Sequence, residues 1–321
     1  MPLLPSPDYR PPRYMLNGHL QTIFPSTLRR TPAFNYRRER IQTPDKDFLD
    51  LDWSTVGSSD TLVVLCHGLE GDSHRPYMKG MVVALNKAGW DALAWNFRSC
   101  SGEPNLLLRS YHMGAMDDLD LVVRYALTQK QYQRVFLVGF SMGGNLILNY
   151  LSQWPAKVPE QVKRAAVFSV PCHLKSACLQ LAKPQNRIYM KRFLKSLHLK
   201  LQEKAQRFPL DLADYHLITT FQEFDDRYTA SLHGFRNADE YYQKCSSVQH
   251  LPKITVPTLL VNAKNDPFLS PQCFPVEQAL QNPNLYLEIP SAGGHVGFSE
   301  SFFKNLYYSE RRAVEFLQGE S

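Results

Sequence analysis

Val135-Phe136-Leu137-Val138-Gly139-Phe140-Ser141-Met142-Gly143 is the stretch that decides the fold of this 321-residue chain. An apolar run typical of a buried strand leads into Gly-x-Ser-x-Gly, and the helix-like stretch 145–151 follows. In such a nucleophile elbow the serine occupies a strained strand-to-helix turn, and the glycines remove side chains that would collide there. The helix N-terminus then offers free N–H groups to a developing oxyanion. The stretch therefore predicts that Ser141 is a nucleophile.

The partners of this serine are predicted from their order along the chain. A serine hydroxyl needs an imidazole to accept its proton and a carboxylate to orient that imidazole, and after an elbow of this kind the acid precedes the histidine. Asp266 follows the apolar run 258–262, and His295 follows the run 285–289. Alone, each could be an ordinary turn or loop residue. Together, they predict a Ser141-Asp266-His295 triad.

The stretch His67-Gly68-Leu69-Glu70-Gly71 is the predicted source of the oxyanion hole. It follows the apolar run 62–66, and its glycines would let the backbone approach a substrate. We expect the donors to be the backbone N–H groups of Leu69 and Met142. For His67 two interpretations stay open: shaping this loop by hydrogen bonding, which we favour, or acting as a base.

The rest of the chain predicts an α/β fold with a mostly parallel central sheet and helices on both faces. An antiparallel hairpin at 37–42 and 48–53 is expected at the sheet edge. The other expected strands are 62–66, 92–96, 135–138, 165–170, 258–262 and 285–289, and the expected helices are 77–88, 116–127, 146–152 and 309–317.

Three regions divide the chain in this interpretation. Residues 1–34, rich in proline and arginine, form an N-terminal arm with short helical pieces near 18–24, packed on the body. Residues 35–170 and 257–321 form the core. Residues 171–256, too long for an ordinary crossover and mostly helical in pattern, form a cap insertion over the carboxyl edge of the sheet.

One predicted helix of the cap is basic and amphipathic. Its apolar residues recur at helical spacing, with lysines and an arginine between them. Either the apolar side packs on the core and the lysines lie in water, which we favour, or the helix contacts anionic lipid or an acyl-phosphate group. The apolar residues are Met190, Phe193, Leu194, Leu197 and Leu201, and the basic ones are Lys191, Arg192, Lys195, Lys200 and Lys204.

Composition excludes several classes of protein. With 44% hydrophobic and 21% charged residues the chain is neither disordered nor collagen-like, and no apolar run approaches a membrane span of roughly 20 residues. The N-terminus lacks the pattern of a secretory signal, so we expect a cytoplasmic protein whose six cysteines stay reduced. The formal charge of +6 comes with no nucleic-acid motif, and no metal site is expected.

Several further motifs are more specific than the elbow. They are among Asn17-Gly18-His19-Leu20-Gln21-Thr22, His67-Gly68-Leu69-Glu70-Gly71, Phe97-Arg98-Ser99-Cys100-Ser101-Gly102-Glu103-Pro104-Asn105, Tyr111-His112, Glu223-Phe224-Asp225-Asp226, Asp266-Pro267-Phe268 and Gly293-Gly294-His295-Val296-Gly297-Phe298. In these motifs the chain resembles the YheT-like branch of the α/β-hydrolase superfamily. The resemblance implies an α/β-hydrolase fold and carries Ser141, Asp266 and His295 over as the triad. One departure is Ser99, where such relatives usually have glycine.

The sequence thus predicts a serine hydrolase that cleaves carboxylic esters of short to medium acyl chains through an acyl-enzyme, without metal or organic cofactor. Its partner would be a small-molecule ester or lipid-like substrate, with weak membrane-surface contact through the cap and no nucleic acid. A lipase, phospholipase or thioesterase with the same triad, or a non-catalytic binding protein of this fold, remains the alternative. Arg98 either touches substrate or forms structural pairs with Glu103 and Asp117, which we favour. The role of His112 and the oligomeric state stay open.

Overall fold

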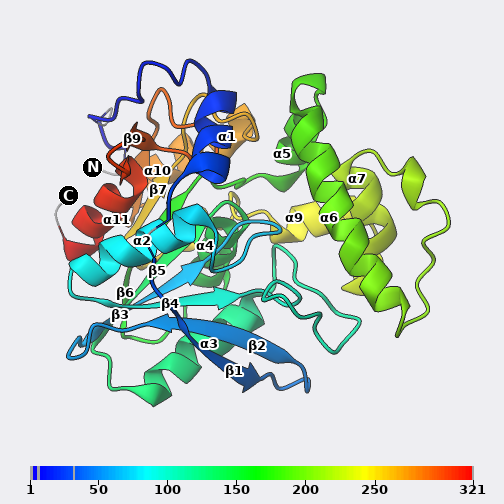
Figure 1. The fold of residues 1–321 in the computed structure, drawn as a ribbon, viewed down its shortest axis with the longest axis horizontal. Coiled ribbons are helices and arrows are strands. Elements are labelled where there is room, and N and C mark those ends of the chain that lie inside the picture. Colours follow the sequence, from blue (N-terminus) through cyan, green and yellow to red (C-terminus); the bar gives the residue numbers. More distant parts are fainter. Residues whose placement is uncertain (1–2, 6–7, 32, 320–321) are drawn as a thin grey trace.

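The computed structural model describes residues 3–5, 8–31 and 33–319, and an eight-stranded sheet forms the centre of the fold (Figure 1). The strand order is β1-β2-β4-β3-β5-β6-β7-β8. The pairs β1·β2 and β2·β4 are antiparallel, and every pair from β4 to β8 in that row is parallel. This confirms the predicted fold class and the hairpin at the edge. The strands are β1 Arg37–Gln42, β2 Phe48–Ser54, β3 Thr61–Cys66, β4 Asp91–Asn96, β5 Arg134–Phe140, β6 Val162–Phe168, β7 Thr258–Val261 and β8 Leu285–Glu288.

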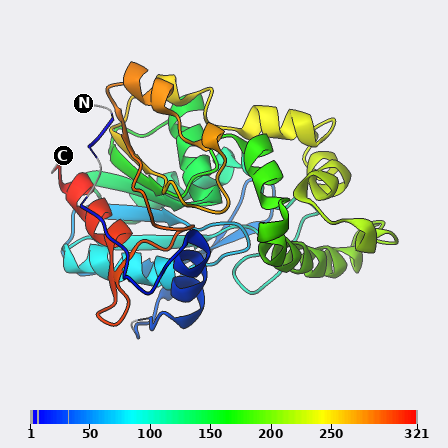
Figure 2. The same cartoon turned by 90° about the horizontal axis from the view of Figure 1, so that it is seen from above.

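Helices cover both faces of the sheet (Figure 2). On one face lie α2 (Pro76–Lys87) and α11 (Tyr308–Gln318), and on the other lie α3 (Met116–Gln129), α4 (Met142–Gln153) and α10 (Val276–Gln281). Successive strand residues point to opposite faces, and β3 illustrates the result. Leu62 and Val64 pack with α3 and α4, whereas Val63 and Leu65 pack with α2 and α11. The central residues of the parallel strands are mostly apolar because both faces of the sheet are buried there.

The helix of the N-terminal arm is longer than the sequence suggested. Helix α1 runs over Gly18–Leu28, so it continues through Pro25, and the Asn17 side chain caps it by accepting the N–H of Leu20. Strand β6 also differs, since it ends at Phe168 rather than at residue 170. Ser169 adopts a φ of +53°, a left-handed conformation that cannot continue a strand.

The chain between β6 and β7 forms a helical segment, residues 171–256, that lies beyond one end of the strands (right in Figure 1). Its α-helices are α5 Leu174–Leu181, α6 Arg187–Ala205, α7 Phe221–Phe224, α8 Ala230–Leu232 and α9 Ala238–Cys245, and a π-helical turn, Asp225–Thr229, joins α7 to α8. Among the residues described, no helix combines the length and apolar character needed to cross a membrane. A short two-stranded ribbon, β9 Ser299–Ser301 with β10 Leu306–Tyr307, precedes α11.

Helix α6 is the predicted amphipathic helix, but the idea that all its lysines lie in water is wrong. Lys200 Nζ lies 2.8 Å from Glu70 Oε1. Lys204 is buried and donates to Asn105 Oδ1 at 2.7 Å and to the Leu107 carbonyl at 2.6 Å. These two cations fasten α6 to the loops below it, whereas Lys191 and Lys195 are exposed.

Candidate active site

Ser141 lies in the turn between β5 and α4, in a strained backbone conformation. Its φ is +52°, a backbone angle that residues other than glycine rarely adopt. The flanking positions require glycine because other backbone atoms lie very close to them. A Cβ on Gly143 would lie 2.3 Å from the Cys66 carbonyl oxygen, and one on Gly139 would lie 2.7 Å from the Gly143 carbonyl oxygen. Only glycine fits at these two positions without displacing backbone. The turn therefore presents Ser141 Oγ at the carboxyl end of the parallel strands.

Ser141, His295 and Asp266 form one hydrogen-bonded chain. His295 Nε2 lies 3.0 Å from Ser141 Oγ, and His295 Nδ1 lies 2.9 Å from Asp266 Oδ2. Asp266 is buried, and its other oxygen accepts the Phe268 N–H at 2.8 Å. Because an ionised carboxylate can only accept, Nδ1 carries the proton and Nε2 is left to accept the serine proton. The Phe268 ring stacks on the imidazole, with 4.1 Å between centroids.

The two residues expected to supply oxyanion donors, Leu69 and Met142, line the same cavity as Ser141. Gly68, just before Leu69, approaches so closely that a Cβ there would lie 3.3 Å from Ser141 Cβ. Met142 is the first residue of α4, so its N–H has no partner within the helix. Among the described residues neither the Leu69 nor the Met142 N–H donates to a protein acceptor. Both donors are therefore available to a ligand.

His67 is a structural histidine. It is fully buried, its Nδ1 lies 2.8 Å from the Gly68 carbonyl, and its Nε2 accepts the Phe97 N–H at 3.1 Å. The Nδ1-H tautomer satisfies both contacts. Burial lowers the pKa of His67 to about 3, so the ring is neutral. This geometry agrees with the loop-shaping interpretation.

Helix α1 holds the loop that carries His295, a role that sequence reasoning missed. The Thr22 hydroxyl accepts the His295 N–H at 2.8 Å and donates to the Gly18 carbonyl at 2.6 Å. Gln21 Oε1 accepts the N–H of Gly293 at 2.8 Å. The motif Asn17-Gly18-His19-Leu20-Gln21-Thr22 was visible in the sequence, but nothing in it indicated which distant loop it would contact.

Arg98 pairs with carboxylates, but not with the ones expected. Its guanidinium lies 2.7 Å from Asp118, 3.0 Å from Asp47 and 3.0 Å from Asp45. The predicted partners pair elsewhere, Glu103 with Arg40 and Asp117 with Arg109. Arg98 is 2% exposed and is absent from the described residues that line the cavities at Ser141. The favoured structural role is thus supported, whereas the predicted pairing with Glu103 and Asp117 was wrong.

The loop of Leu69 is tied to the helical segment through Glu70. The carboxylate of Glu70 accepts from Lys200 and from the hydroxyls of Ser196 and Tyr111, and the Tyr111 hydroxyl also receives the Glu70 N–H at 3.2 Å. A buried carboxylate with this many donors is held in one position. The helical segment and the predicted oxyanion loop therefore form a single hydrogen-bonded unit.

Two cavities meet at Ser141 and His295. The first, about 130 Å³, lies under the helical segment and is largely apolar. Phe193, Leu197, Phe224 and Leu232 are among its lining residues, and His112 and His233 lie in its wall with ring centroids 4.5 Å apart. Burial holds the pKa of His112 well below its ordinary value.

The second cavity is more polar. It lies between α1, the loop of Leu69 and α6, and its lining includes Arg75, Arg192 and Ser196. An ester bound with its carbonyl at Ser141 could place its acyl and alcohol portions on different sides of the nucleophile. The site thus combines an oriented serine with separate apolar and polar spaces.

Comparison with known proteins identifies the family of this chain. A family model described as the alpha/beta hydrolase fold matches residues 61–302. YheT of Escherichia coli (strain K12), which carries the name of an esterase, is 35% identical over 91% of this chain and 87% of its own. Phospholipase ABHD3 of Homo sapiens is 30% identical over 97% of this chain and 78% of its own.

The structural comparison points to the same fold. The esterase Pf2001 of Pyrococcus furiosus superposes with a TM-score of 0.60 at 21% identity, covering 89% of this chain and 91% of its own. At that identity the likeness concerns the fold alone. The family model and the relatives extend over most of the sequence. The chain therefore belongs to the α/β-hydrolase family, an enzyme family in which its relatives include proteins named esterase and phospholipase.

Proposed function

We propose that this protein is a serine hydrolase of carboxylic esters. The observation that carries the proposal is the chain Ser141–His295–Asp266, with contacts of 3.0 and 2.9 Å, opening into an apolar cavity. A serine, a base that can accept its proton and a buried carboxylate that fixes the base are the parts that acyl transfer needs. The esterase and phospholipase names of its relatives are consistent with this chemistry.

The proposed reaction proceeds in two halves. Ser141 Oγ attacks the ester carbonyl while His295 Nε2 takes the hydroxyl proton, and Asp266 stabilises the imidazolium that results. The carbonyl oxygen becomes negative and is held by the N–H groups of Leu69 and Met142. When the tetrahedral intermediate collapses, His295 gives the proton to the departing alcohol. Water, activated by the same imidazole, then releases the acid and regenerates Ser141.

The preferred substrates are esters of short to medium acyl chains. Lined by Phe193, Leu197 and Phe224, the first cavity offers an apolar surface for an acyl chain, and burial of each methylene contributes about 0.8 kcal/mol. We propose that the helical segment, residues 171–256, acts as the cap that encloses this chain.

Hydrolysis of a phospholipid acyl ester is the second candidate, and the second cavity favours it. Arg75 and Arg192 line that cavity beside Ser141, where guanidinium groups could receive a phosphate. Lys191 and Lys195 are exposed on the same helix as Arg192, which would suit contact with an anionic lipid surface. The relative named phospholipase adds weight to this candidate.

The proposal is tested by covalent labelling and by rates. A fluorophosphonate probe should label the protein and should fail to label Ser141→Ala, while Ser231→Ala, a change at an exposed serine of the helical segment, should keep full labelling. Rates are then compared across p-nitrophenyl esters from acetate to palmitate, matched thioesters and amides, and a phospholipid of matched chain.

We expect ester hydrolysis that Ser141→Ala lowers by roughly 10⁴- to 10⁶-fold. A folded wild-type protein that neither takes the probe nor turns over any ester would contradict the proposal and favour a non-catalytic binding protein. Faster turnover of the phospholipid than of the matched simple ester would favour the second candidate.

A further inference from the structure

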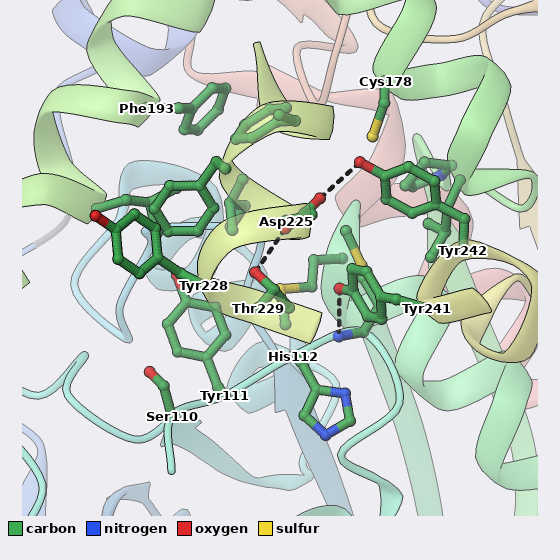
Figure 3. Close-up of a pocket in the computed structure, with 18 of the residues that line it drawn as sticks. Ser110, Tyr111, His112, Cys178, Phe193, Asp225, Tyr228, Thr229, Tyr241 and Tyr242 are labelled. Carbon is green, nitrogen blue, oxygen red and sulfur yellow. Dashed lines mark hydrogen bonds between the residues drawn. The ribbon is translucent and has the colours of Figure 1, made fainter. Parts of the chain in front are cut away.

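Asp225 is a buried carboxyl group in the wall of the first cavity, the same apolar space that reaches Ser141 (Figure 3). The residue is 8% exposed and lies in the π-helical turn Asp225–Thr229 between α7 and α8. Turns of this kind are rare and frequently occur at functional sites. The catalytic steps proposed above make no use of this carboxyl group.

The carboxyl group of Asp225 has unused capacity to accept hydrogen bonds. Thr229 Oγ1 donates to Oδ1 at 2.6 Å, and the Tyr242 hydroxyl donates to Oδ2 at 2.7 Å, as Figure 3 shows. A carboxylate offers about four acceptor positions, so two neutral donors leave part of it unsatisfied. Within the described part of the chain no lysine, arginine or histidine pairs with Asp225.

A carboxylate in this position is energetically costly without a further partner. Burying an ionised group away from water is unfavourable unless a cation or several donors compensate. Burial raises the pKa of Asp225 to about 7, and the two hydrogen bonds only partly oppose that rise. The cavity around it is otherwise largely apolar, with Phe224 and Leu232 among its lining residues.

The two cations that line the same cavity are already engaged. Lys200 pairs with Glu70, and Lys204 donates to Asn105 and to backbone carbonyls. A complementary donor for Asp225 would therefore come from a ligand. A ligand that carries a carboxylate there would meet repulsion from the ionised form of Asp225, and a ligand that ends in a methyl group would bury that carboxylate without donating a hydrogen bond to it.

We propose that Asp225 is a specificity residue that accepts a hydrogen bond from a hydroxyl or ammonium group on the acyl chain of the substrate. That the ligand is a substrate rests on the proposed esterase function. The binding site itself is inferred from the cavity and its carboxylate alone. Acyl chains that carry such a donor would bind in preference to plain alkyl chains of the same length, because only they satisfy the buried acceptor.

The first experiment measures selectivity. For p-nitrophenyl esters in a chain-length series, kcat/KM is compared between acyl groups ending in methyl, hydroxyl, ammonium or carboxylate. At the optimal length, wild type should prefer the hydroxyl or the ammonium ester by about tenfold or more over the methyl ester. Asp225→Leu should lose that preference, Asp225→Asn should lose the preference for the ammonium ester because its amide carries no charge, and Asp226→Asn, the exposed neighbour, should keep both. Equal rates for all chain ends in wild type would overturn the inference.

The second experiment separates this inference from the esterase proposal, because it needs no turnover. In the Ser141→Ala background, n-hexylamine, n-hexanol and n-hexyl methyl ether are compared as ligands by thermal denaturation. The amine or the alcohol should raise the melting temperature more than the ether does, and Asp225→Leu, which has no acceptor, should remove the difference. An ether that stabilises the protein as well as both donors would overturn the assignment, even if ester hydrolysis is found.

Discussion

Thr22→Val should impair catalysis by releasing the backbone of His295, although Thr22 lies in α1, 273 positions before His295 in the sequence. The substitution keeps the shape of the side chain and removes the hydroxyl that accepts the His295 N–H at 2.8 Å. That N–H would then be left without its acceptor next to the imidazole that must stay 3.0 Å from Ser141 Oγ. The structure therefore links a helix of the N-terminal arm to the orientation of the proposed base.

The magnitude follows from the cost of an unsatisfied donor. Leaving a buried N–H unpaired costs about 1–3 kcal/mol. If the loop relieves this cost by moving toward another acceptor, the correctly placed histidine becomes the minor state. With about 1.4 kcal/mol for each factor of ten, kcat should fall roughly 5- to 150-fold. KM should change less than kcat, because Thr22 is absent from the described lining of the first cavity and is one of many residues that line the second.

The assay is ester hydrolysis with rates of fluorophosphonate labelling as an independent readout of the nucleophile. Thr27→Val is the matched control, since the Thr27 hydroxyl also donates to the carbonyl four residues back in α1 but lies exposed and away from the site. Thr22→Ser restores the hydroxyl and should recover most of the activity. If Thr22→Val and Thr27→Val have the same kcat and the same labelling rate, the proposed bracing of His295 is refuted.

Two other predictions concern stability. Because burial lowers the pKa of His67 to about 3, the unfolded chain binds a proton on this residue that the folded chain does not. Below roughly pH 6.5 the contribution of His67 should therefore lower the free energy of unfolding by about 1.4 kcal/mol per pH unit. His67→Gln should lack this contribution. The free energy of unfolding in urea is measured for both proteins from neutral to mildly acidic pH, and the same pH dependence in both would show that the reasoning is wrong. Arg98→Met should cost about 3–5 kcal/mol, because it leaves buried carboxylates unpaired. Arg124→Met, which breaks an exposed pair with Asp120, should cost less than about 1 kcal/mol, and similar losses for the two variants would count against a special role for Arg98.

The parts of the fold that the sequence predicted are those with local signals. Apolar runs marked the parallel strands, and the elbow glycines, together with the order of Asp266 and His295, anticipated three residues that the structure places within hydrogen-bond distance. Helix α4 begins at Met142 rather than near residue 146 because it is buried on every side, so no polar face marks its first turn.

What could not be predicted depends on contacts between distant segments. Thr22 and His295 are 273 positions apart, and nothing in either residue type indicates that the two are in contact. Lys204 looked like a solvated lysine by its place in an amphipathic pattern, yet the loop at Asn105 folds over it. For the same reason Asp225 could be noticed in the sequence but not placed in the cavity of Ser141.

The contact between α1 and the His295 loop also determines when the site can form during synthesis on the ribosome. A ribosome releases α1 early, but the backbone groups that it braces are synthesised some 270 residues later. At a synthesis rate of roughly 5–20 residues per second, α1 leaves the ribosome on the order of tens of seconds before the loop of His295. On the proposed mechanism, the growing polypeptide has no complete triad until β8 and the loop of His295 have been synthesised. A translation product that ends before residue 295 would therefore lack an activated nucleophile.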